Sequence, residues 1–425
     1  MREMKDSGIE WIGQIPLDWK VDKIKYHLKR NEPKNPGNAI VLSVYRDYGV
    51  IPKDSRDDNH NVTSEDTSKY KYVKKGQLVI NKMKAWQGSL AVSDYNGIVS
   101  PAYFIYDFTD EEYNHKYFHY LVRSCYKEEF KRISGGIREG QWDLSPEAFA
   151  NTLVLLPPLV EQKYIADYLD TKCSEIDATA EDIQKEISLL EEYKKSVITE
   201  AVTKGLNPDV EMKDSEIEWI GEVPKHWVTI RIGNAFSIRN ERNYLPMEQV
   251  QLLSLYSGKG VFPTGEEGTT NRGNHAQTVA DYKIVKKNDI VVNIILAWMG
   301  SLGISNYNGV VSPAYDVYIP NEEKIVPHYY HYVFRTSGIA NECYRYGRGI
   351  MMMRWRTYSS EFKRIHVPFP PLAEQQQIAD YLDTKCSEID AIIADKKCQQ
   401  GILAEYKKSL IYEYVTGKKE VPVHE

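Results

Sequence analysis

The sequence lacks the features by which several large protein classes are recognised. It holds five cysteines among 425 residues, without a Cys-x-x-C pair, so we expect free thiols rather than disulfides or a zinc site. No apolar run is long enough to span a bilayer. The first residues, MREMKDSGIEW, lack the apolar core of a signal peptide. These absences favour a cytoplasmic protein that contacts no membrane.

Signatures of catalysis are missing as well. No glycine fingerprint of the dinucleotide-binding type follows a strand-like run, and there is no Walker A loop. The tetrapeptide SPAY, at Ser100–Tyr103 and Ser312–Tyr315, lacks the amide or acid and the second proline of adenine methyltransferases. The histidines show no spacing typical of metal ligands. We therefore expect a chain that performs no chemistry itself and binds no metal.

Acidic charge is unevenly distributed, although the whole chain carries a net charge of −6. Residues 1–156 hold 23 lysines and arginines against 22 aspartates and glutamates, and residues 212–368 hold 18 against 15. The other two segments are acidic, with 6 against 13 in residues 157–211 and 7 against 10 in residues 369–425. Charge per segment decides which partners are excluded. A nucleic-acid partner therefore stays possible for the two mildly basic segments.

The chain is a tandem repeat of one unit of about 212 residues. MKDSGIEWIGQIPLDW, at Met4–Trp19, returns as MKDSEIEWIGEVPKHW at Met212–Trp227. IADYLDTKCSEIDA occurs without change at Ile165–Ala178 and Ile378–Ala391. The period is far too long for a solenoid. We predict two similar domains, each followed by the same kind of tail.

Each tail predicts a long helix with one apolar seam. Apolar residues recur at spacings of mostly 3 and 4, which is the heptad pattern of coiled coils. The helices would begin after Pro157-Pro158 and Pro370-Pro371 and end at Gly205 and Gly417. A helix of about 45 residues is ~65 Å long. The predicted seams are Ile165, Leu169, Cys173, Ile176, Ala180, Ile183, Ile187, Leu190, Lys194, Val197 and Ala201, and then Ile378, Leu382, Cys386, Ile389, Ile393, Lys396, Gln400, Leu403, Lys407, Leu410 and Tyr414.

The predicted helices can bury their seams by pairing with other chains or with each other. The first helix leads into the second domain and the second helix would return, so mutual pairing is antiparallel and brings the C-terminus beside the N-terminus. The expected fold is α/β (α+β), with two similar globular heads and two long helices forming an antiparallel intramolecular coiled coil with pseudo-twofold symmetry. Lys396 and Gln400 stand where the first seam has Ile183 and Ile187, which weakens the middle of the second seam.

Both heads are predicted to mix strands and helices in the same order. Strand-like runs are rich in β-branched and aromatic residues. In the first head they cover residues 39–45, 76–81, 103–108 and 151–157, with an amphipathic helix over 114–133. In the second head they cover 250–256, 288–296, 315–320 and 364–370, with a helix from about residue 327.

Two loops in each head combine a shared frame with different contents. NKMKAWQGS at Asn81–Ser89 matches NIILAWMGS at Asn293–Ser301, and GGIREGQWDLS at Gly135–Ser145 matches RGIMMMRWRTY at Arg348–Tyr358. This pattern is typical of two readers of two targets. Alternatively, the tryptophans are core aromatics and the polar residues belong to solvated loops. The candidate DNA-binding residues are Lys82, Lys84, Trp86, Gln87, Arg138, Gln141, Trp142, Trp298, Arg348, Arg354, Trp355 and Arg356.

The chain resembles the specificity subunit of a type I DNA restriction–modification system over nearly its whole length. The resemblance rests on the doubled opening, WIGQIPLDW and WIGEVPKHW, and on the doubled run PPLVEQKYIADYLDTKCSEID and PPLAEQQQIADYLDTKCSEID. It implies that each head is a target recognition domain for half of a split DNA sequence, and that the coiled coil fixes the gap between the halves. The expected boundaries are 1–156 and 212–369 for the recognition domains, 157–211 for the central helix and linker, and 370–425 for the C-terminal helix.

The resemblance also implies partners that supply the chemistry. Two modification subunits would bring S-adenosylmethionine and methylate adenine at N6, and restriction subunits would add ATP- and Mg-dependent translocation. This chain would then bind double-stranded DNA and no cofactor. Identical off-seam residues suggest that both helices face the same partner, although recent duplication also explains them. A protein-binding scaffold without DNA readout is the alternative function, and an enzyme with an unrecognised site is a third. The partner-binding candidates are Lys172, Glu175, Asp177, Lys385, Glu388 and Asp390.

Overall fold

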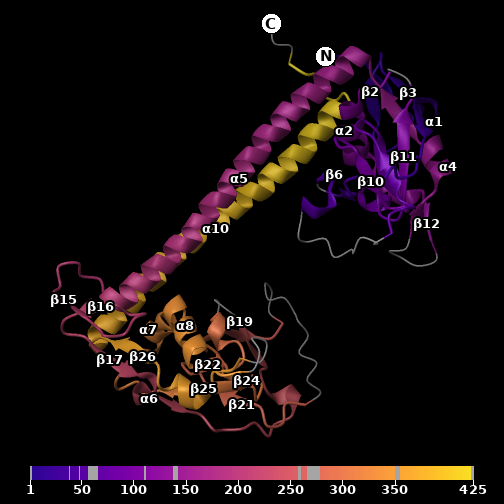
Figure 1. Cartoon of the computed structure of the whole chain (residues 1–425). Helices are drawn as coiled ribbons and strands as arrows, with labels where there is room; N and C mark the ends of the chain where they lie inside the picture. The colour runs from indigo at the N-terminus through magenta and orange to yellow at the C-terminus, as the bar shows by residue number, and fades with distance from the viewer. Residues whose placement is uncertain are drawn as a thin grey trace. The chain divides into compact units, whose positions relative to one another are not determined.

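The contacts within the protein divide the chain into two units. The computed structural model describes residues 2–37, 39–46, 48–55, 66–109, 112–136, 142–256, 260–265, 278–349 and 355–422. One unit comprises Met1–Ile183 with Cys398–Glu425, and the other comprises Gln184–Lys397. Each unit holds one head and one half of each long helix (Figure 1). Among the described residues, no helix has the length and apolar character that crossing a membrane requires.

The head of the first unit mixes strands and helices in the predicted order. Its elements are β1 (Met4–Asp6), β2 (Gln14–Pro16), β3 (Lys20–Lys23), α1 (Ile24–His27), β4 (Leu28–Arg30), β5 (Leu42–Tyr45), β6 (Gly49–Pro52), η1 (Lys53–Ser55), β7 (Lys71–Val73), β8 (Leu78–Asn81), η2 (Ala85–Gln87), β9 (Leu90–Val92), β10 (Gly97–Val99), β11 (Tyr103–Phe108), α2 (His115–Cys125), α3 (Lys127–Arg132), β12 (Ser134–Gly135), β13 (Asp143–Leu144), α4 (Pro146–Asn151) and β14 (Leu153–Leu156). The single helix expected over 114–133 is broken at Tyr126, where φ is −108° and ψ is 4°.

An antiparallel sheet that is buried on both faces organises this head. Its strand order is β4-β11-β8-β9. Along β8, Leu78 and Ile80 belong to the core that includes α2 and α3, whereas Val79 belongs to a second core with residues of β5, β6 and β10. Successive side chains of a strand point to opposite faces. A strand covered on both sides therefore needs an unbroken apolar run, which is why this run could be recognised in the sequence.

The head of the second unit repeats this architecture, with the sheet order β18-β25-β22-β23. The strand expected over 288–296 ends at Asn293, where a turn begins. The elements are β15 (Met212–Asp214), β16 (Glu222–Pro224), β17 (Val228–Arg231), α6 (Ile232–Ala235), β18 (Phe236–Ile238), η3 (Met247–Gln249), β19 (Leu253–Tyr256), β20 (Gly260–Pro263), β21 (Lys283–Val285), β22 (Ile290–Asn293), η4 (Ala297–Met299), β23 (Leu302–Ile304), β24 (Gly309–Val311), β25 (Tyr315–Pro320), α7 (Pro327–Val333), α8 (Ser337–Tyr346), α9 (Ser359–Phe362) and β26 (His366–Phe369).

The two tails form the predicted helices, α5 (Leu159–Lys204) with 46 residues and α10 (Leu372–Val415) with 44 residues. Every predicted seam position on both helices is buried or half-buried. Gly205 and Gly417 follow the helices with φ of 78° and 68°, in the left-handed region that favours glycine at a helix end. The sequence therefore predicted both the seams and the stops.

Within the first unit, α5 and α10 run antiparallel. The rings of Tyr168 and Tyr414 lie 4.6 Å apart, and the carboxylate of Asp177 lies 2.6 Å from Nζ of Lys407. Residue numbers thus rise along α5 while they fall along α10. The two helices of this chain therefore bury their seams against each other, as predicted.

The second unit shows the same antiparallel pairing. Glu186 pairs with Lys396 at 2.5 Å, and Lys194 pairs with Asp390 at 2.6 Å. The polar seam position Lys396 thus finds a charged partner on α5. In the first unit another polar seam position, Gln400, donates its side-chain amide to a backbone carbonyl of α5 at 3.2 Å. The two polar residues that replace isoleucines in the second seam are therefore partnered rather than left buried without hydrogen bonds.

The end of α10 meets the beginning of the chain inside the first unit. A Cβ atom placed on Gly417 would lie 2.5 Å from Cδ of Pro16 and 3.0 Å from the ring of Trp19. The same junction occurs inside the second unit, where a Cβ atom on Gly205 would lie 3.2 Å from the ring of Trp227. The C-terminus therefore lies beside the N-terminus, as the repeat predicted.

Candidate nucleic-acid interface

The doubled sequence motifs build the joint between head and helix. In the first unit the indole N–H of Trp19 donates to the carboxylate of Glu161 at 2.9 Å. The neighbouring Gln162 is fully buried, where it accepts the backbone N–H of Asn114 at 2.8 Å and donates to the carbonyl of Glu112 at 2.7 Å. A buried amide needs such partners. The Glu-Gln pair after the double proline therefore fixes the head on α5.

The second unit repeats this joint with its own copies of the motif. Trp227 donates to Glu374 at 2.8 Å, and Gln375 accepts the backbone N–H of Val326 at 2.8 Å. The hydroxyl of Tyr329 donates to the carbonyl of Val202 on α5 at 2.8 Å. Burial raises the pKa of Tyr329 well above its ordinary value. The repeated motifs thus serve attachment of the heads, and the variable loops carry what differs between them.

The two loops that the sequence singled out lie together in the first head. The rings of Trp86, in η2, and Trp142, before β13, are 5.5 Å apart. Next to them, Nζ of Lys82 lies 2.9 Å from the carboxylate of Asp143. The backbone N–H of Leu144 donates to the carbonyl of Lys82 at 2.9 Å, which ties the second loop to the first.

The shared Ala-Trp-x-Gly-Ser frame closes a tight turn in both heads. Gly88 and Gly300 have φ of 92° and 75°, a conformation that glycine adopts without steric cost. The indole N–H groups of Trp86 and Trp298 donate back to the carbonyls of Met83 and Ile295, both at 3.0 Å. The frame therefore sets the direction of each tryptophan, while the residues around it are free to differ.

The second head brings its loops together through an extra aromatic residue. The ring of Tyr344, in α8, lies 6.0 Å from Trp298 and stacks on Trp355 with 5.2 Å between centroids. Trp355 donates its indole N–H to the carbonyl of Tyr344 at 3.0 Å. Sequence reasoning missed Tyr344, since nothing in its spacing relates it to either loop.

The tryptophans of these loops are not core residues. Trp86, Trp142, Trp298 and Trp355 are half-buried, whereas the tryptophans of the apolar cores are the fully buried Trp19 and Trp227. Trp298 also packs against the apolar core of the second head, so the loop tryptophans are partly exposed aromatics rather than fully buried core residues. We call each cluster, Trp86 with Trp142 and Trp298 with Tyr344 and Trp355, the aromatic surface of its head.

The polar candidates around the aromatic surfaces have different surroundings. Lys84 is exposed and Gln87 is half-buried. Arg348 is exposed, pairs with Glu361 at 2.7 Å and exchanges backbone hydrogen bonds with Arg356 at 2.9 Å. The predicted candidates Arg138, Gln141 and Arg354 lie outside the described residues.

In the first unit, the partner-binding candidates lie beside exposed apolar residues that the sequence reasoning missed. Lys172 and Glu175 form an ion pair at 2.7 Å on the outer face of α5, and this bond raises the pKa of Lys172. Tyr406 of α10 directly precedes Lys407, whose side chain pairs with Asp177 of α5, so it belongs to the stretch of α10 that faces this part of α5. Tyr406 is 54% exposed and Ile402 is 63% exposed. We call Lys172, Glu175, Ile402 and Tyr406 the first docking surface.

The second unit carries the duplicate of this surface. Lys385 and Glu388 of α10 pair at 3.0 Å, and Tyr193 of α5 acts on the pKa of Lys385. Tyr193 is 51% exposed, and Leu189, the equivalent of Ile402, is exposed as well. We call these residues the second docking surface. It recurs because the two units are copies of one sequence.

Asp177 and Asp390 have a structural reason to recur. Asp177 pairs with Lys407, and Asp390 makes the equivalent pair with Lys194, both at 2.6 Å and between the two helices. Exposed pairs of this kind contribute ~0.2–1 kcal/mol each. Their identity in the two copies is therefore explained by helix pairing without any partner protein, a role that the off-seam position in the sequence did not suggest.

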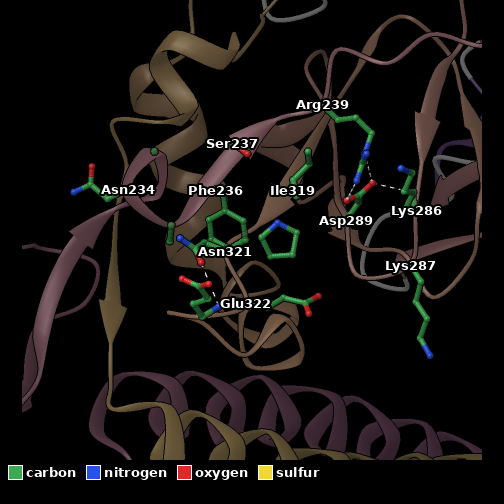
Figure 2. Close-up of a pocket in the computed structure, with 14 residues that line it drawn as sticks. Asn234, Phe236, Ser237, Arg239, Lys286, Lys287, Asp289, Ile319, Asn321 and Glu322 are labelled. Atoms are coloured by element: carbon green, nitrogen blue, oxygen red, sulfur yellow. Dashed lines mark hydrogen bonds and ion pairs between the residues drawn. The ribbon is translucent and has the colours of Figure 1, made fainter.

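A pocket of about 650 Å³ opens in the head of the second unit, lined by residues of α6, β18, the segment before β22 and the end of β25 (Figure 2). Arg239 and Asp289 form a bidentate ion pair there, with N–O distances of 2.7 and 2.9 Å. The first head has Asn31 and Gln77 at the equivalent positions. The two charges neutralise each other, which fits a structural role in connecting the end of β18 with the beginning of β22.

Comparison with known proteins identifies relatives over almost the whole chain. A family model described as "Type I restriction modification DNA specificity domain" matches residues 18–189 and 224–399. The "Putative type I restriction enzyme MjaX specificity subunit" of Methanocaldococcus jannaschii is 24% identical over 432 residues, covering 96% of each chain. The "Type I restriction enzyme EcoBI specificity subunit" of Escherichia coli is 25% identical over 59% of this chain and 54% of its own.

Two solved structures share the fold. A chain from a study of complex assembly and conformational transition of the type I R-M system has a TM-score of 0.68, with 14% identity, and covers 95% of this chain and 99% of its own. The HsdS subunit of Thermoanaerobacter tengcongensis has a TM-score of 0.52, also with 14% identity, over 95% of this chain and 98% of its own.

Proposed function

The chain belongs to the type I restriction–modification DNA specificity family, whose domain it contains twice, and from this premise we propose that each head reads one half of a bipartite DNA target. It is a specificity subunit with two recognition domains. We propose the cytoplasm as its place of action. The observation that carries the proposal is the aromatic surface, which occurs once in each head on a shared frame with different neighbours.

Different neighbours suit different half-sites. The first head places Lys82, Lys84 and Gln87 beside its tryptophans, whereas the second places Arg348 and Arg356 there. In the major groove, the planar fork of arginine favours guanine, and glutamine favours adenine. Lysines beside a duplex also neutralise phosphates. The heads are therefore proposed to share a docking geometry and to differ in the bases they accept.

The docking surfaces support two copies of one partner. Each unit presents an exposed tyrosine and an aliphatic residue beside a Lys-Glu pair, and aromatic residues flanked by polar groups are common in protein interfaces. We propose that a modification subunit binds at each docking surface and brings S-adenosylmethionine for adenine methylation. Restriction subunits would join with ATP and Mg. This chain would bind DNA and its partners, and no cofactor.

The test is the methylated motif of a host that carries this chain with its modification subunits. Trp142→Ala should relax or abolish recognition of one half-site, and Trp355→Ala should affect only the other. Trp11→Ala is the matched control, because Trp11 is exposed and lies outside the aromatic surfaces. A host without any bipartite methylated motif would contradict the proposal. Equal loss of both half-sites in either variant would show that the heads do not read independently.

A scaffold without DNA readout remains the second candidate, because the docking surfaces alone would serve it. The two functions differ in salt dependence, since a DNA reader binds duplexes through phosphates and weakens as salt rises. The assembled complex is the proper sample for a mobility shift with duplex DNA. Assembly without salt-sensitive duplex binding would favour the scaffold.

A further inference from the structure

We propose that Arg46, at the start of the turn between β5 and β6, is a third reading element of the first head and contacts a guanine of the first half-site. The inference rests on the proposed function, since it assigns a further specificity residue to the same DNA target. Sequence reasoning did not single out this turn, which lies about 40 positions before the η2 loop.

The fold places Arg46 against the aromatic surface of the first head. Its guanidinium donates from Nη2 to Oε1 of Gln87 at 3.3 Å. Its Cγ lies 4.0 Å from the position of a Cβ atom on Gly88, so the side chain crosses the end of the η2 turn. Arg46 is exposed, as is Tyr48 at the other side of the turn. The turn thus extends the aromatic surface with an arginine that points outward.

A network behind the turn holds its backbone in place. Arg123 of α2 donates to the carbonyl of Arg46 and, at 3.2 Å, to Nε2 of His119. Burial, together with the charge of Arg123, lowers the pKa of His119 to about 3. The ring is therefore neutral near pH 7 and can accept this bond. Gly49 has φ of 72°, and a Cβ atom there would lie 2.9 Å from the guanidinium of Arg123. The backbone is fixed from inside, which leaves the side chain of Arg46 to face outward.

The second head contains the equivalent arginine–histidine pair. Arg335 lies 3.1 Å from Nε2 of His331, and burial lowers the pKa of His331 to about 3. Gly260, with φ of 104°, takes the place of Gly49 next to this histidine.

The contents of the turn differ between the heads. The first head has Arg46-Asp47-Tyr48, whereas the second has Ser257-Gly258-Lys259, which lie outside the described residues. If the turn only connected two strands, we would not expect the arginine–histidine pair behind it to be retained while the residues of the turn differ. The same combination of shared frame and different contents marks the two loops of the aromatic surface.

The chemistry of Arg46 fits base readout. A guanidinium carries five N–H donors in a planar fork, which matches the O6 and N7 acceptors of guanine in the major groove. One donor is engaged by the half-buried Gln87 at 3.3 Å, which is a long bond. This bond orients the guanidinium and leaves further N–H donors for a base. Lysine has the same charge but no planar fork of donors. Replacing Arg46 by lysine therefore distinguishes a contact to a base from a contact to a phosphate.

The experiment is the methylated motif of a host that expresses the complete modification complex. Arg46→Ala should lower discrimination at one base pair of one half-site by on the order of 10- to 100-fold, with the other half-site unchanged. Arg46→Lys should show the same relaxed position, because it keeps the charge and loses the fork. Lys25→Ala is the matched control: it removes one exposed positive charge of the same head, on α1, and should leave the motif unchanged.

Each alternative outcome overturns a distinct statement. An unchanged motif in Arg46→Ala overturns the inference. An even loss of methylation at all sites, rescued by Arg46→Lys, assigns Arg46 to a phosphate and overturns the guanine contact. An even loss with a lowered melting temperature assigns it a structural role in the turn and also overturns the inference. If the complex with the original Arg46 methylates no bipartite motif, the proposed function is wrong, and the inference that rests on it is wrong as well.

Discussion

Lengthening the helical pair by one heptad in each helix tests whether the helices set the gap between the half-sites. Leu190 and Leu403 are equivalent positions of the two repeats, but they do not lie opposite each other because the helices pair antiparallel. The ion pairs Glu186–Lys396 and Lys194–Asp390 bracket Leu190 on α5 and residues near Ile393 on α10. Insertions after Leu190 and Ile393 therefore face each other and keep the flanking pairs intact.

The expected shift follows from helix geometry. Seven residues add ~10 Å to each helix at 1.5 Å per residue. This length corresponds to about 3 base pairs at ~3.4 Å each. Seven residues also equal two turns of the 3.5-residue repeat, so both seams stay in phase. Four residues would rotate the seam and expose part of it. The double heptad variant should keep its melting temperature, and a matched four-residue variant should lose stability.

The assay is the methylated motif of a host that carries the double heptad variant. Both half-site sequences should persist, while the unspecified gap between them grows by about 3 base pairs. The four-residue variant is the control for helix disruption, since it changes the length without keeping the seam. An unchanged gap with full methylation would refute the reasoning, because it would assign the spacing to the heads or to the modification subunits.

Two further predictions concern the docking surfaces and the buried histidines. Tyr406→Ala and Tyr193→Ala should each remove one of two modification subunits from the purified complex, because a hot-spot tyrosine contributes ~2 kcal/mol or more to the binding free energy. Tyr26→Ala, which changes an exposed residue of a head, is the control. Two modification subunits retained in either tyrosine variant would contradict the assignment. Since the pKa values of His119 and His331 are lowered to about 3, the unfolded chain binds more protons below pH ~6.5, so the unfolding free energy should fall by up to ~1.4 kcal/mol per histidine for each pH unit between pH 6 and 5. Denaturant titrations at pH 6 and 5 should show a smaller decrease in unfolding free energy for the variant with both histidines replaced by glutamine than for the unmutated chain. An equal decrease in the two proteins would contradict the lowered pKa values.

The sequence by itself determined the repeat, the long helices and one strand within each of the eight predicted strand-like runs. A heptad seam is a local pattern, so Ile165 and its successors predicted a buried stripe without knowledge of what covers it. The direction of pairing also followed, because a tandem repeat with one helix after each head can return only antiparallel. Runs such as residues 103–108 formed strands with the predicted bounds, since a sheet buried on both faces needs apolar residues at consecutive positions. The family resemblance then added the function.

Local patterns predicted less of the candidate site. Trp86 and Trp142 were each recognised within a shared frame, but spacing does not show that they lie 5.5 Å apart. Asp177 was recognised as an off-seam residue, but its spacing does not show that its carboxylate pairs with Lys407 across the two helices. In both cases the decisive neighbour comes from a distant part of the sequence, and only the packing of the fold selects it.

Tertiary structure alone decided which residues lie at the aromatic surface of each head. Tyr344 enters it from a helix, and Arg46 enters it from a hairpin turn, although neither has a local pattern that distinguishes it from other exposed residues. Periodicity reports which face of an element is buried, because burial constrains every third or fourth residue of a helix and every second residue of a strand. A surface assembled from several loops imposes no period on any of them. Its members can therefore be identified only after the core has placed the loops side by side.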